Sequence, residues 1–471
     1  MLDVEHFDLI VIGSGPAGEK GAAQAAYFGK KVAIIEKAPA VGGAGVHTGT
    51  LPSKTLREAA LYLTGFRKRE LYGMTLDLDR RASLRRLMGR LNAVTGEQVE
   101  QISRNLDRHD VTLVHGAASF VSPHEVTVHD ARHPGQPERR LTAGVFLIAT
   151  GSSPLRPAGV PFEDRDVEDS DTILELDRIP ESLAVVGGGV IGCEYACIFG
   201  ALGARITIIE GRPALMRFLD QEMSDALSSI LECDGHQVRL GDAVQQITRV
   251  PGGPLKLALK SGAELLVDKV LYSAGRAGNT SGLALDRAGV TTDAKGRLLV
   301  NAQFQTSTPH IYGAGDVIGS PALASVSMEQ ARVAMCHAFE IDYKTRVAAI
   351  TPFGIYTIPE ISMVGSTEEE LTGRGVAFEV GRARYENNAR GQITGERDGI
   401  LKLVFEVPSR KLLGVHIIGD HATELIHVGQ MAMTAGATID VFIQAVFNFP
   451  TLSELYKYAA YDGLGRLARR S

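Results

Sequence analysis

Two segments of the 471-residue chain repeat one pattern of strand, glycine-rich loop, helix and strand. In the first copy an apolar run from Phe7 leads into Gly13-Ser-Gly15-Pro-Ala-Gly18, and a second apolar run ends at Glu36. The first glycine permits a tight turn, the second lets a pyrophosphate approach the backbone, and the third lets the helix pack on the strand. An acid about 20 residues further on accepts hydrogen bonds from a ribose. The pattern predicts a dinucleotide-binding unit.

The second copy runs from Leu183 through Gly187-Gly-Gly189-Val-Ile-Gly192 to Glu210. Neither copy has lost a glycine or its acid, so we expect two bound dinucleotides and electron transfer between them. The alternative is that one copy is a relic that binds nothing.

Length, charge and cysteine spacing narrow the class of protein. The chain exceeds the ~250–300 residues at which one core stops growing, so two or more domains are expected. A net charge of −6 disfavours nucleic acid and anionic membranes as partners. No apolar run reaches the ~18 residues of a spanning helix, and a strand-like run already begins at Phe7, so we expect a cytoplasmic protein without a signal peptide.

The spacing of histidines and cysteines predicts no metal site. We expect Cys193 and Cys197 to pack on a buried helix rather than form a redox pair.

A third segment, from Gly42-Gly43 to Pro52-Ser53-Lys54, resembles the redox-active segment of flavin disulfide reductases, GG-x-C-x-x-x-x-C-x-P-S-K. Gly45 and Thr50 stand at the two cysteine positions. Without those thiols the chain cannot pass electrons from a flavin to a disulfide. Near the C-terminus, Phe449 replaces the histidine of the family's His-Pro-Thr-Leu-Ser-Glu-like segment, and a phenyl ring cannot carry a proton. The two losses together predict hydride transfer alone; the alternative is neutral drift in a decayed enzyme.

The resemblance also assigns the cofactors. Phe146–Gly151 and Ile311–Asp316 are similar to the family's A-T-G and G-D segments, which implies non-covalent FAD at the first copy and NAD(H) or NADP(H) at the second. The implied fold class is α/β, with two Rossmann-like dinucleotide-binding domains and a C-terminal α+β dimerisation domain that forms homodimers. The expected boundaries are 1–155 and 280–350 for FAD, 156–279 for NAD(P), and 351–471 for the interface domain.

The resemblance implies the following site residues. Lys54 and Glu194 would form a catalytic pair beside the flavin. Contacts to FAD are expected at Gly13, Gly15, Gly18, Glu36, Lys37, Gly42, Gly43, Lys54, Ala117, Thr150, Gly151, Asp316, Leu323 and Ala324. Contacts to NAD(P) are expected at Gly187, Gly189, Val190, Ile191, Gly192, Glu194, Glu210, Arg212 and Gly275.

Within this family the sequence resembles the soluble, FAD-dependent pyridine nucleotide transhydrogenases. That subgroup keeps threonine at the second cysteine position and an aromatic residue at the place of Phe449, but its members often keep the first cysteine, where this chain has Gly45. The implied reaction is hydride exchange between NADPH and NAD⁺. The alternatives are an NAD(P)H dehydrogenase or oxidase that reduces quinone, dye or oxygen, and a redox-silent flavoprotein that senses nucleotides. Glu210 favours NAD(H), and Arg212 is the nearest group that could admit a 2′-phosphate.

Overall fold

A computed structural model describes residues 4–68, 71–73, 80–130, 132–133, 138–175 and 177–470. The chain divides into two compact units, one made of residues 1–55, 88–155 and 275–348, and the other of residues 56–87, 156–274 and 349–471.

The first unit is built on a sheet of seven strands in the order β3-β2-β1-β6-β5-β4, with β17 also paired to β6. The central strands are parallel, and β4 and β5 form an antiparallel edge. The strands are β1 (Val4–Ile12), β2 (Val32–Glu36), β3 (Thr112–His115), β4 (Ala117–Ser122), β5 (Glu125–His129), β6 (Arg139–Ile148) and β17 (Ile311–Gly313).

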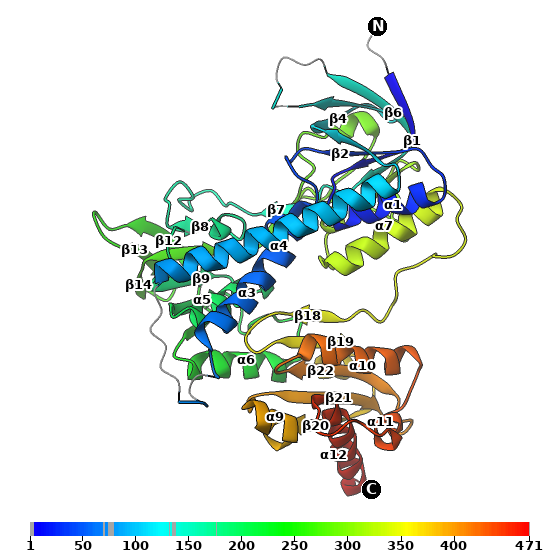
Figure 1. The fold of residues 1–471 in the computed structure, drawn as a ribbon. Helices are drawn as coiled ribbons and strands as arrows, with labels where there is room; N and C mark the ends of the chain where they lie inside the picture. Colours follow the sequence, from blue (N-terminus) through cyan, green and yellow to red (C-terminus); the bar gives the residue numbers. More distant parts are fainter. Residues whose placement is uncertain are drawn as a thin grey trace. The chain divides into compact units, whose positions relative to one another are not determined.

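Helices α1 (Pro16–Tyr27) and α7 (Ala324–Ala338) lie side by side in this unit (Figure 1). They share one buried cluster with Leu9 and Val11 of β1, and alanines on both helices keep the packing close. A second cluster around Phe120 and Phe146 fills the opposite face of the sheet. The unit also contains β7 (Ser152–Pro154) and β16 (Arg276–Gly278), which pair antiparallel, and the short helix α2 (Gly43–His47).

The second unit contains an all-parallel sheet of five strands in the order β11-β10-β9-β15-β8. Every residue of β9 is buried, as expected for a parallel strand covered on both faces. The elements are β8 (Val167–Glu168), β9 (Ser182–Val186), α5 (Val190–Ala201), β10 (Arg205–Glu210), α6 (Gln221–Cys233), β11 (Gln237–Leu240) and β15 (Lys269–Tyr272), with an antiparallel sheet of β12 (Val244–Arg249), β13 (Leu255–Leu259) and β14 (Glu264–Val267).

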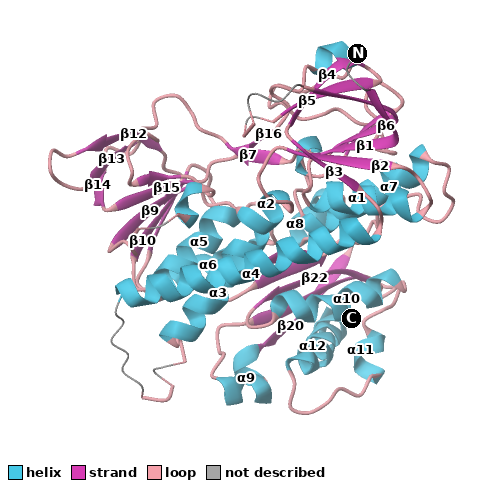
Figure 2. Ribbon diagram, turned by 45° about the horizontal axis from the view of Figure 1, so that its top comes forward, coloured by secondary structure: helices cyan, strands magenta, loops and turns pink. Residues whose placement is uncertain are grey.

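A third sheet of the same unit is antiparallel, in the order β18-β19-β22-β21-β20. Leu401, Leu403 and Phe405 of β21 point into a core shared with α10, α11 and α12, which Figure 2 shows beside these strands. Lys402 alternates with them and points to the other face. The elements are β18 (Phe353–Ile355), β19 (Ile361–Gly365), α8 (Glu368–Gly373), β20 (Phe378–Arg384), α9 (Ala389–Thr394), β21 (Ile400–Glu406), β22 (Leu412–Ile418), α10 (Ala422–Thr434), α11 (Asp440–Gln444) and α12 (Leu455–Arg470).

These sheets confirm the expected fold class: one dinucleotide-type sheet is parallel apart from its β4–β5 edge, the other is all-parallel, and the C-terminal part is α+β. The domain boundaries named above stay a prediction. Two more helices, α3 (Thr50–Thr64) and α4 (Arg80–Arg108), complete the fold. Among the described residues, no helix combines the length and apolar character needed to cross a membrane.

Candidate functional site

The first glycine loop joins β1 to α1 and has room for a ligand at one position only. A Cβ on Gly18 would lie 1.8 Å from the carbonyl oxygen of Gly13, so the start of α1 packs too closely on the loop for any side chain there. A Cβ on Gly15 would meet nothing nearer than Gly43 Cα, at 3.9 Å. The space over Gly15 is therefore open beside the N-terminus of a helix, where backbone N–H groups favour a phosphate.

The second glycine loop, between β9 and α5, repeats this geometry. A Cβ on Gly192 would lie 2.0 Å from the carbonyl oxygen of Gly187, whereas a Cβ on Gly189 would meet no atom within 4 Å. Val190 and Ile191 form the half-exposed first residues of α5.

Glu36 and Glu210, the acids that end the two dinucleotide motifs, each accept hydrogen bonds from their own glycine loop. Glu36 Oε2 accepts hydrogen bonds from the backbone N–H and the hydroxyl of Ser14, at 2.9 and 2.6 Å, and Oε1 accepts one from the Ala38 N–H at 2.7 Å. Glu210 Oε2 accepts one from the Gly188 N–H at 2.8 Å. A carboxylate has about four acceptor positions, so Glu36, with three in use, can also receive a ribose hydroxyl, whereas Glu210 can do so when the Arg212 side chain turns away from it.

Arg212 engages Glu210 in a bidentate ion pair. Its Nε donates to Oε1 and its Nη2 to Oε2, each at 2.9 Å, and its backbone N–H donates to Oε1 as well. Burial opposes ionisation of Glu210, but these bonds outweigh it and lower the pKa of the carboxyl. The Arg212 side chain is 52% exposed, so its guanidinium can reach a ligand from the solvent side.

The carboxyl ends of β6 and β17 bring the predicted FAD residues of distant segments to one sheet edge. β17 pairs parallel with β6, so Asp316 and Thr150 follow neighbouring strand ends. A Cβ on Gly13 would lie 3.3 Å from Thr150 Cα, which places the first glycine loop at the same edge. The remaining predicted contacts in this unit are Gly151 (directly after Thr150), Lys37 (exposed after β2), Ala117 (at the start of β4), Leu323 and Ala324 (at the N-terminus of α7), and Gly42 and Gly43 (at the start of α2).

The side chain of Thr150 indicates that a ligand can bind at this sheet edge. Its Oγ1 is buried and has no hydrogen-bond partner within the described part of the chain, while its carbonyl oxygen accepts a bond from Asn279. A buried hydroxyl without a partner is costly, and a ligand that bonds it removes the cost. Together with the open space over Gly15 and the α1 N-terminus, it makes the site suited to a dinucleotide such as FAD.

Sequence reasoning missed two residues that act on Asp316. Ser152 Oγ donates to Asp316 Oδ2 at 3.0 Å, and Arg276 Nε donates to Ser152 Oγ at 2.8 Å. Arg276 Nη2 also donates to the Ser152 carbonyl oxygen at 2.7 Å. These residues hold the carboxylate in place, and no spacing rule could link Ser152 to Arg276, which lies 124 positions away. The predicted Gly275 precedes Arg276, and its carbonyl oxygen accepts the Leu155 N–H at 3.0 Å.

The two former cysteine positions carry no sulfur. Gly45 lies on α2, where a Cβ would come within 2.9 Å of Pro16 Cγ, and Thr50 is the exposed first residue of α3. The predicted packing of Cys193 and Cys197 is confirmed: both are free, buried thiols on α5. Burial raises the pKa of Cys197 to about 12 and that of Cys193 well above its usual range, so neither is a reactive thiolate.

Lys54 and Glu194 lie in different compact units. Lys54 Nζ donates to Ser53 Oγ at 3.3 Å. Glu194 is buried on α5, and its Oε1 accepts the Tyr356 N–H at 2.9 Å. Their pairing beside a flavin stays a prediction.

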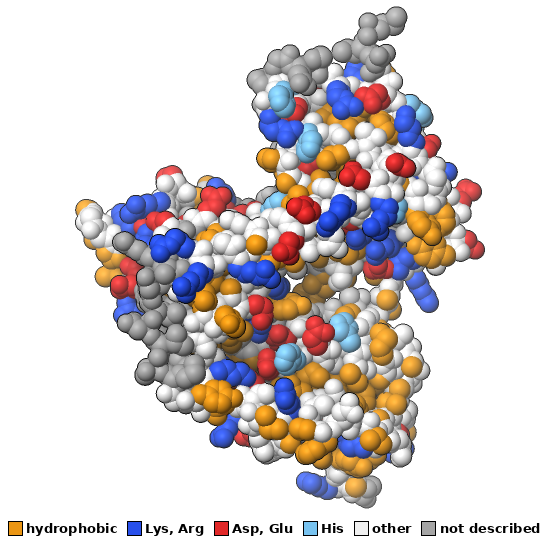
Figure 3. Space-filling model, viewed as in Figure 1, with side chains coloured by type: hydrophobic (Ala, Val, Ile, Leu, Met, Phe, Trp, Pro, Cys, Tyr) orange, Lys and Arg blue, Asp and Glu red, His pale blue; other side chains and the backbone are white. Residues whose placement is uncertain are grey.

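Exposed hydrophobic side chains gather over the C-terminal part of the chain (Figure 3). Phe449, at the place of the family's histidine, is 74% exposed, and Val446 is 95% exposed. An apolar patch of this kind marks a surface for protein contact.

Two family descriptions match the chain. Residues 7–331 match "Pyridine nucleotide-disulphide oxidoreductase", and residues 351–460 match the dimerisation domain of the same name.

Similar proteins cover nearly the whole chain. A Mycobacterium tuberculosis protein named soluble pyridine nucleotide transhydrogenase is 44% identical over 464 residues, covering 98% of each chain. A protein of the same name from Pectobacterium atrosepticum is 42% identical and covers 99% of this chain and 100% of its own. Among solved structures, the Cu(II) complex of the HOCl-induced flavoprotein disulfide reductase RclA from Escherichia coli matches with a TM-score of 0.87 at 25% identity, covering 97% of this chain and 99% of that one.

Proposed function

Because the chain belongs to the pyridine nucleotide-disulphide oxidoreductase family, we propose that it is an FAD-dependent transhydrogenase that exchanges hydride between NADPH and NAD⁺. The observation that carries the proposal is that both dinucleotide motifs are complete while the redox dithiol and its histidine are absent, with Gly45, Thr50 and Phe449 in their places. The names of the relatives support the same activity. No observation favours the dehydrogenase or the redox-silent alternative.

Bound FAD supplies a carrier that accepts a hydride from one nicotinamide nucleotide and returns it to another. Gly15 leaves room for its pyrophosphate at the start of α1, Glu36 accepts its ribose hydroxyls, and Thr150 and Asp316 contact it from the adjoining strand ends. Lys54 supplies a positive charge for the reacting edge of the flavin, where such a charge stabilises charge that develops during transfer.

The second motif binds the nicotinamide nucleotides one at a time. Gly189 leaves room for the pyrophosphate, and Glu210 accepts the adenosine ribose diol, which favours NAD(H). Arg212 offsets the negative charge of Glu210 and can turn to a 2′-phosphate, so NADP(H) binds too. With no dithiol to receive the electrons, a second nucleotide entering this site collects the hydride.

The working form is a cytoplasmic homodimer formed through the C-terminal part. The match of residues 351–460 to a dimerisation domain and the exposed apolar patch over that segment support the dimer. The name "soluble" carried by the relatives supports the location.

The test is an exchange assay on the FAD-loaded protein. NADPH should reduce an NAD⁺ analogue with a distinct absorbance band, at a rate well above quinone or oxygen reduction under the same conditions. If NADPH does not bleach the flavin at any workable concentration, or if quinone or oxygen is the faster acceptor, the transhydrogenase proposal is wrong.

A further inference from the structure

The middle of the loop that carries Arg212 is hydrogen-bonded to the second glycine motif. It leaves β10 after Glu210 and reaches the start of α6 at Asp220. The Met216 N–H donates to the Gly188 carbonyl oxygen at 2.9 Å, and the side chains of Leu215 and Met216 are buried. Met216 has a φ of +40°, a left-handed conformation that surrounding contacts must maintain in a residue other than glycine.

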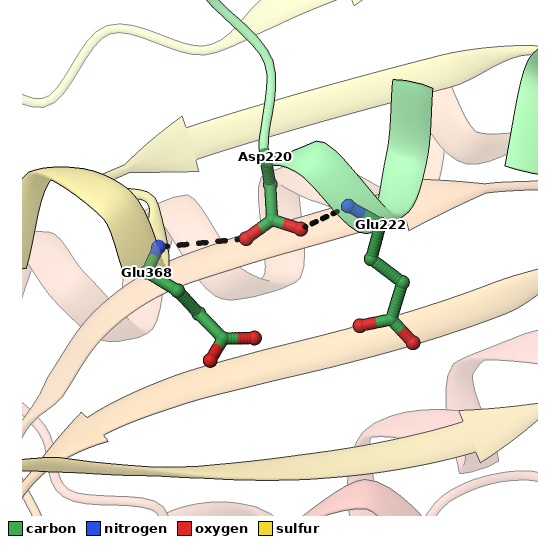
Figure 4. A group of neighbouring side chains, drawn as sticks. All are labelled: Asp220, Glu222 and Glu368. Carbon is green, nitrogen blue, oxygen red and sulfur yellow. Dashed lines mark hydrogen bonds between the residues drawn. The ribbon is translucent and has the colours of Figure 1, made fainter. Parts of the chain in front are cut away.

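Asp220 secures the far end of this loop. Its side chain is fully buried and caps α6 by accepting the Glu222 N–H at 3.1 Å, and it accepts the Glu368 N–H of α8 at 3.4 Å (Figure 4). Both its oxygens also accept hydrogen bonds from Lys402 Nζ, at 2.7 and 2.8 Å. One buried carboxylate thus ties the loop to the C-terminal sheet.

Lys402 is the centre of this charge cluster. Its side chain is 2% exposed, and its Nζ pairs with Glu222 Oε2 at 3.0 Å and with Glu368. Burial alone would lower the pKa of Lys402, but Asp220 and its acidic neighbours outweigh it and raise the pKa. The three carboxylates could hold a metal ion by their spacing, yet the Lys402 ammonium already contacts all three.

The Asp220–Lys402 pair is the most buried ion pair of the cluster, so water screens it least. Glu222 and Glu368 line an open groove of about 540 Å³ and also pair with Arg382, so solvent and a second cation moderate their charges. Lys402 also borders this groove, but its side chain is only 2% exposed and that of Asp220 is fully buried. Removing Lys402 would leave the buried Asp220 carboxylate without its contacting cation, and removing Asp220 would leave Lys402 with only the two more exposed carboxylates, so either change drives local rearrangement.

We propose that Lys402 is a positioning residue for nucleotide recognition, which acts through Asp220 to hold the 211–220 loop, and with it Arg212, against the second glycine motif. The inference rests on the proposed function, because it assigns that loop to nucleotide binding. It places a determinant of NADP(H) affinity in the C-terminal sheet, 182 positions from Asp220 and outside both glycine motifs. Loss of the Asp220–Lys402 pair should weaken binding of the 2′-phosphate of NADP(H) and leave the rate of hydride transfer unchanged.

The test compares Lys402→Met, Asp220→Asn and the double variant, all loaded with FAD. Each single variant should raise the KM for NADPH and the Kd for NADP⁺ by roughly 10-fold, and the KM for NADH by less. The rate of flavin reduction at saturating NADPH should stay within about 3-fold of wild type. The double variant should recover part of the affinity, because it leaves no buried charge without a partner.

Lys256→Met is the matched control. Lys256 pairs with Glu264 at 2.6 Å in the same unit, but both side chains are partly exposed, so its loss should leave nucleotide affinity unchanged. Asn also caps helices well, so Asp220→Asn should fold and can still test the proposal if Lys402→Met does not fold. Variants that melt earlier but bind NADP⁺ and NADH as wild type does would overturn the positioning role. Failure of the exchange activity itself would appear in the wild type, whereas failure of this inference appears only in the variants' affinities.

Discussion

Arg212 and Glu210, two residues apart at the end of β10, hold each other in a bidentate ion pair with both bonds at 2.9 Å. Glu210 is nearly buried, whereas half of the Arg212 side chain faces solvent. The pair therefore combines a carboxylate for a ribose diol with a guanidinium that cancels its charge. On the proposed function, this arrangement would let one site admit both NAD(H) and NADP(H).

Replacing Arg212 with alanine should weaken NADP(H) selectively. The variant loses a charge-assisted bond to the 2′-phosphate and leaves Glu210 without its counter-charge, so we expect a loss of about 1.5–3 kcal/mol, or roughly 10- to 150-fold in Kd. Titration of NADP⁺ and NAD⁺ against wild type measures it. Arg205→Ala, at the other end of β10, is the control and should change neither value. Equal weakening of both nucleotides would contradict the assignment.

Replacing Glu210 with glutamine should shift preference the other way. The amide keeps the shape but removes the charge that repels a 2′-phosphate, and it frees Arg212 from its ion pair. The ratio of kcat/KM for NADPH to that for NADH should rise above the wild-type ratio. A ratio that falls would mean that Glu210 does not face the adenosine ribose.

Lys54→Met should slow flavin reduction far more than it weakens nucleotide binding. Removal of one preorganised charge at a reacting edge typically costs ~10²-fold or more in rate. Stopped-flow bleaching at saturating NADPH separates this rate from binding, and Lys295→Met on the exposed surface is the control. An unchanged reduction rate would assign Lys54 a structural role only.

In a reductive titration the protein should take up no more than about two electrons per flavin, because it has no dithiol to accept electrons from the flavin. No thiolate–flavin charge-transfer band should form. Introducing Gly45→Cys with Thr50→Cys should still give no good disulfide reductase, since Phe449 cannot transfer a proton and a Cβ at position 45 lies 2.9 Å from Pro16 Cγ. Efficient lipoamide or glutathione reduction by wild type would show that the segment has been misinterpreted.

Gly15→Val should abolish FAD binding while the chain still folds. The valine side chain would enter the space over Gly15, where the pyrophosphate is expected, and its Cβ would meet no protein atom nearer than 3.9 Å. Flavin absorbance of the purified protein measures the effect. Gly465→Ala, on a helix with free space around it, should retain its flavin.

The sequence by itself determined the two glycine motifs, their flanking strands and helices, and the loss of the dithiol. These features are local: the close approach of Gly18 to Gly13 or of Gly192 to Gly187 depends on a few consecutive residues, so spacing is enough to predict them. The predicted strand ends at Glu36 and Glu210 are confirmed for the same reason.

Only the tertiary structure decided which distant side chains meet. Thr150 and Asp316 follow neighbouring strand ends because β17 pairs with β6, and Arg276 reaches Asp316 through Ser152. In the sequence, Lys402 is a polar residue within a mostly apolar strand. Its contact with Asp220 depends on which face of the sheet α6 and α8 cover. Such contacts follow from strand order, register and packing between elements far apart in the chain, and local residue spacing does not specify any of these.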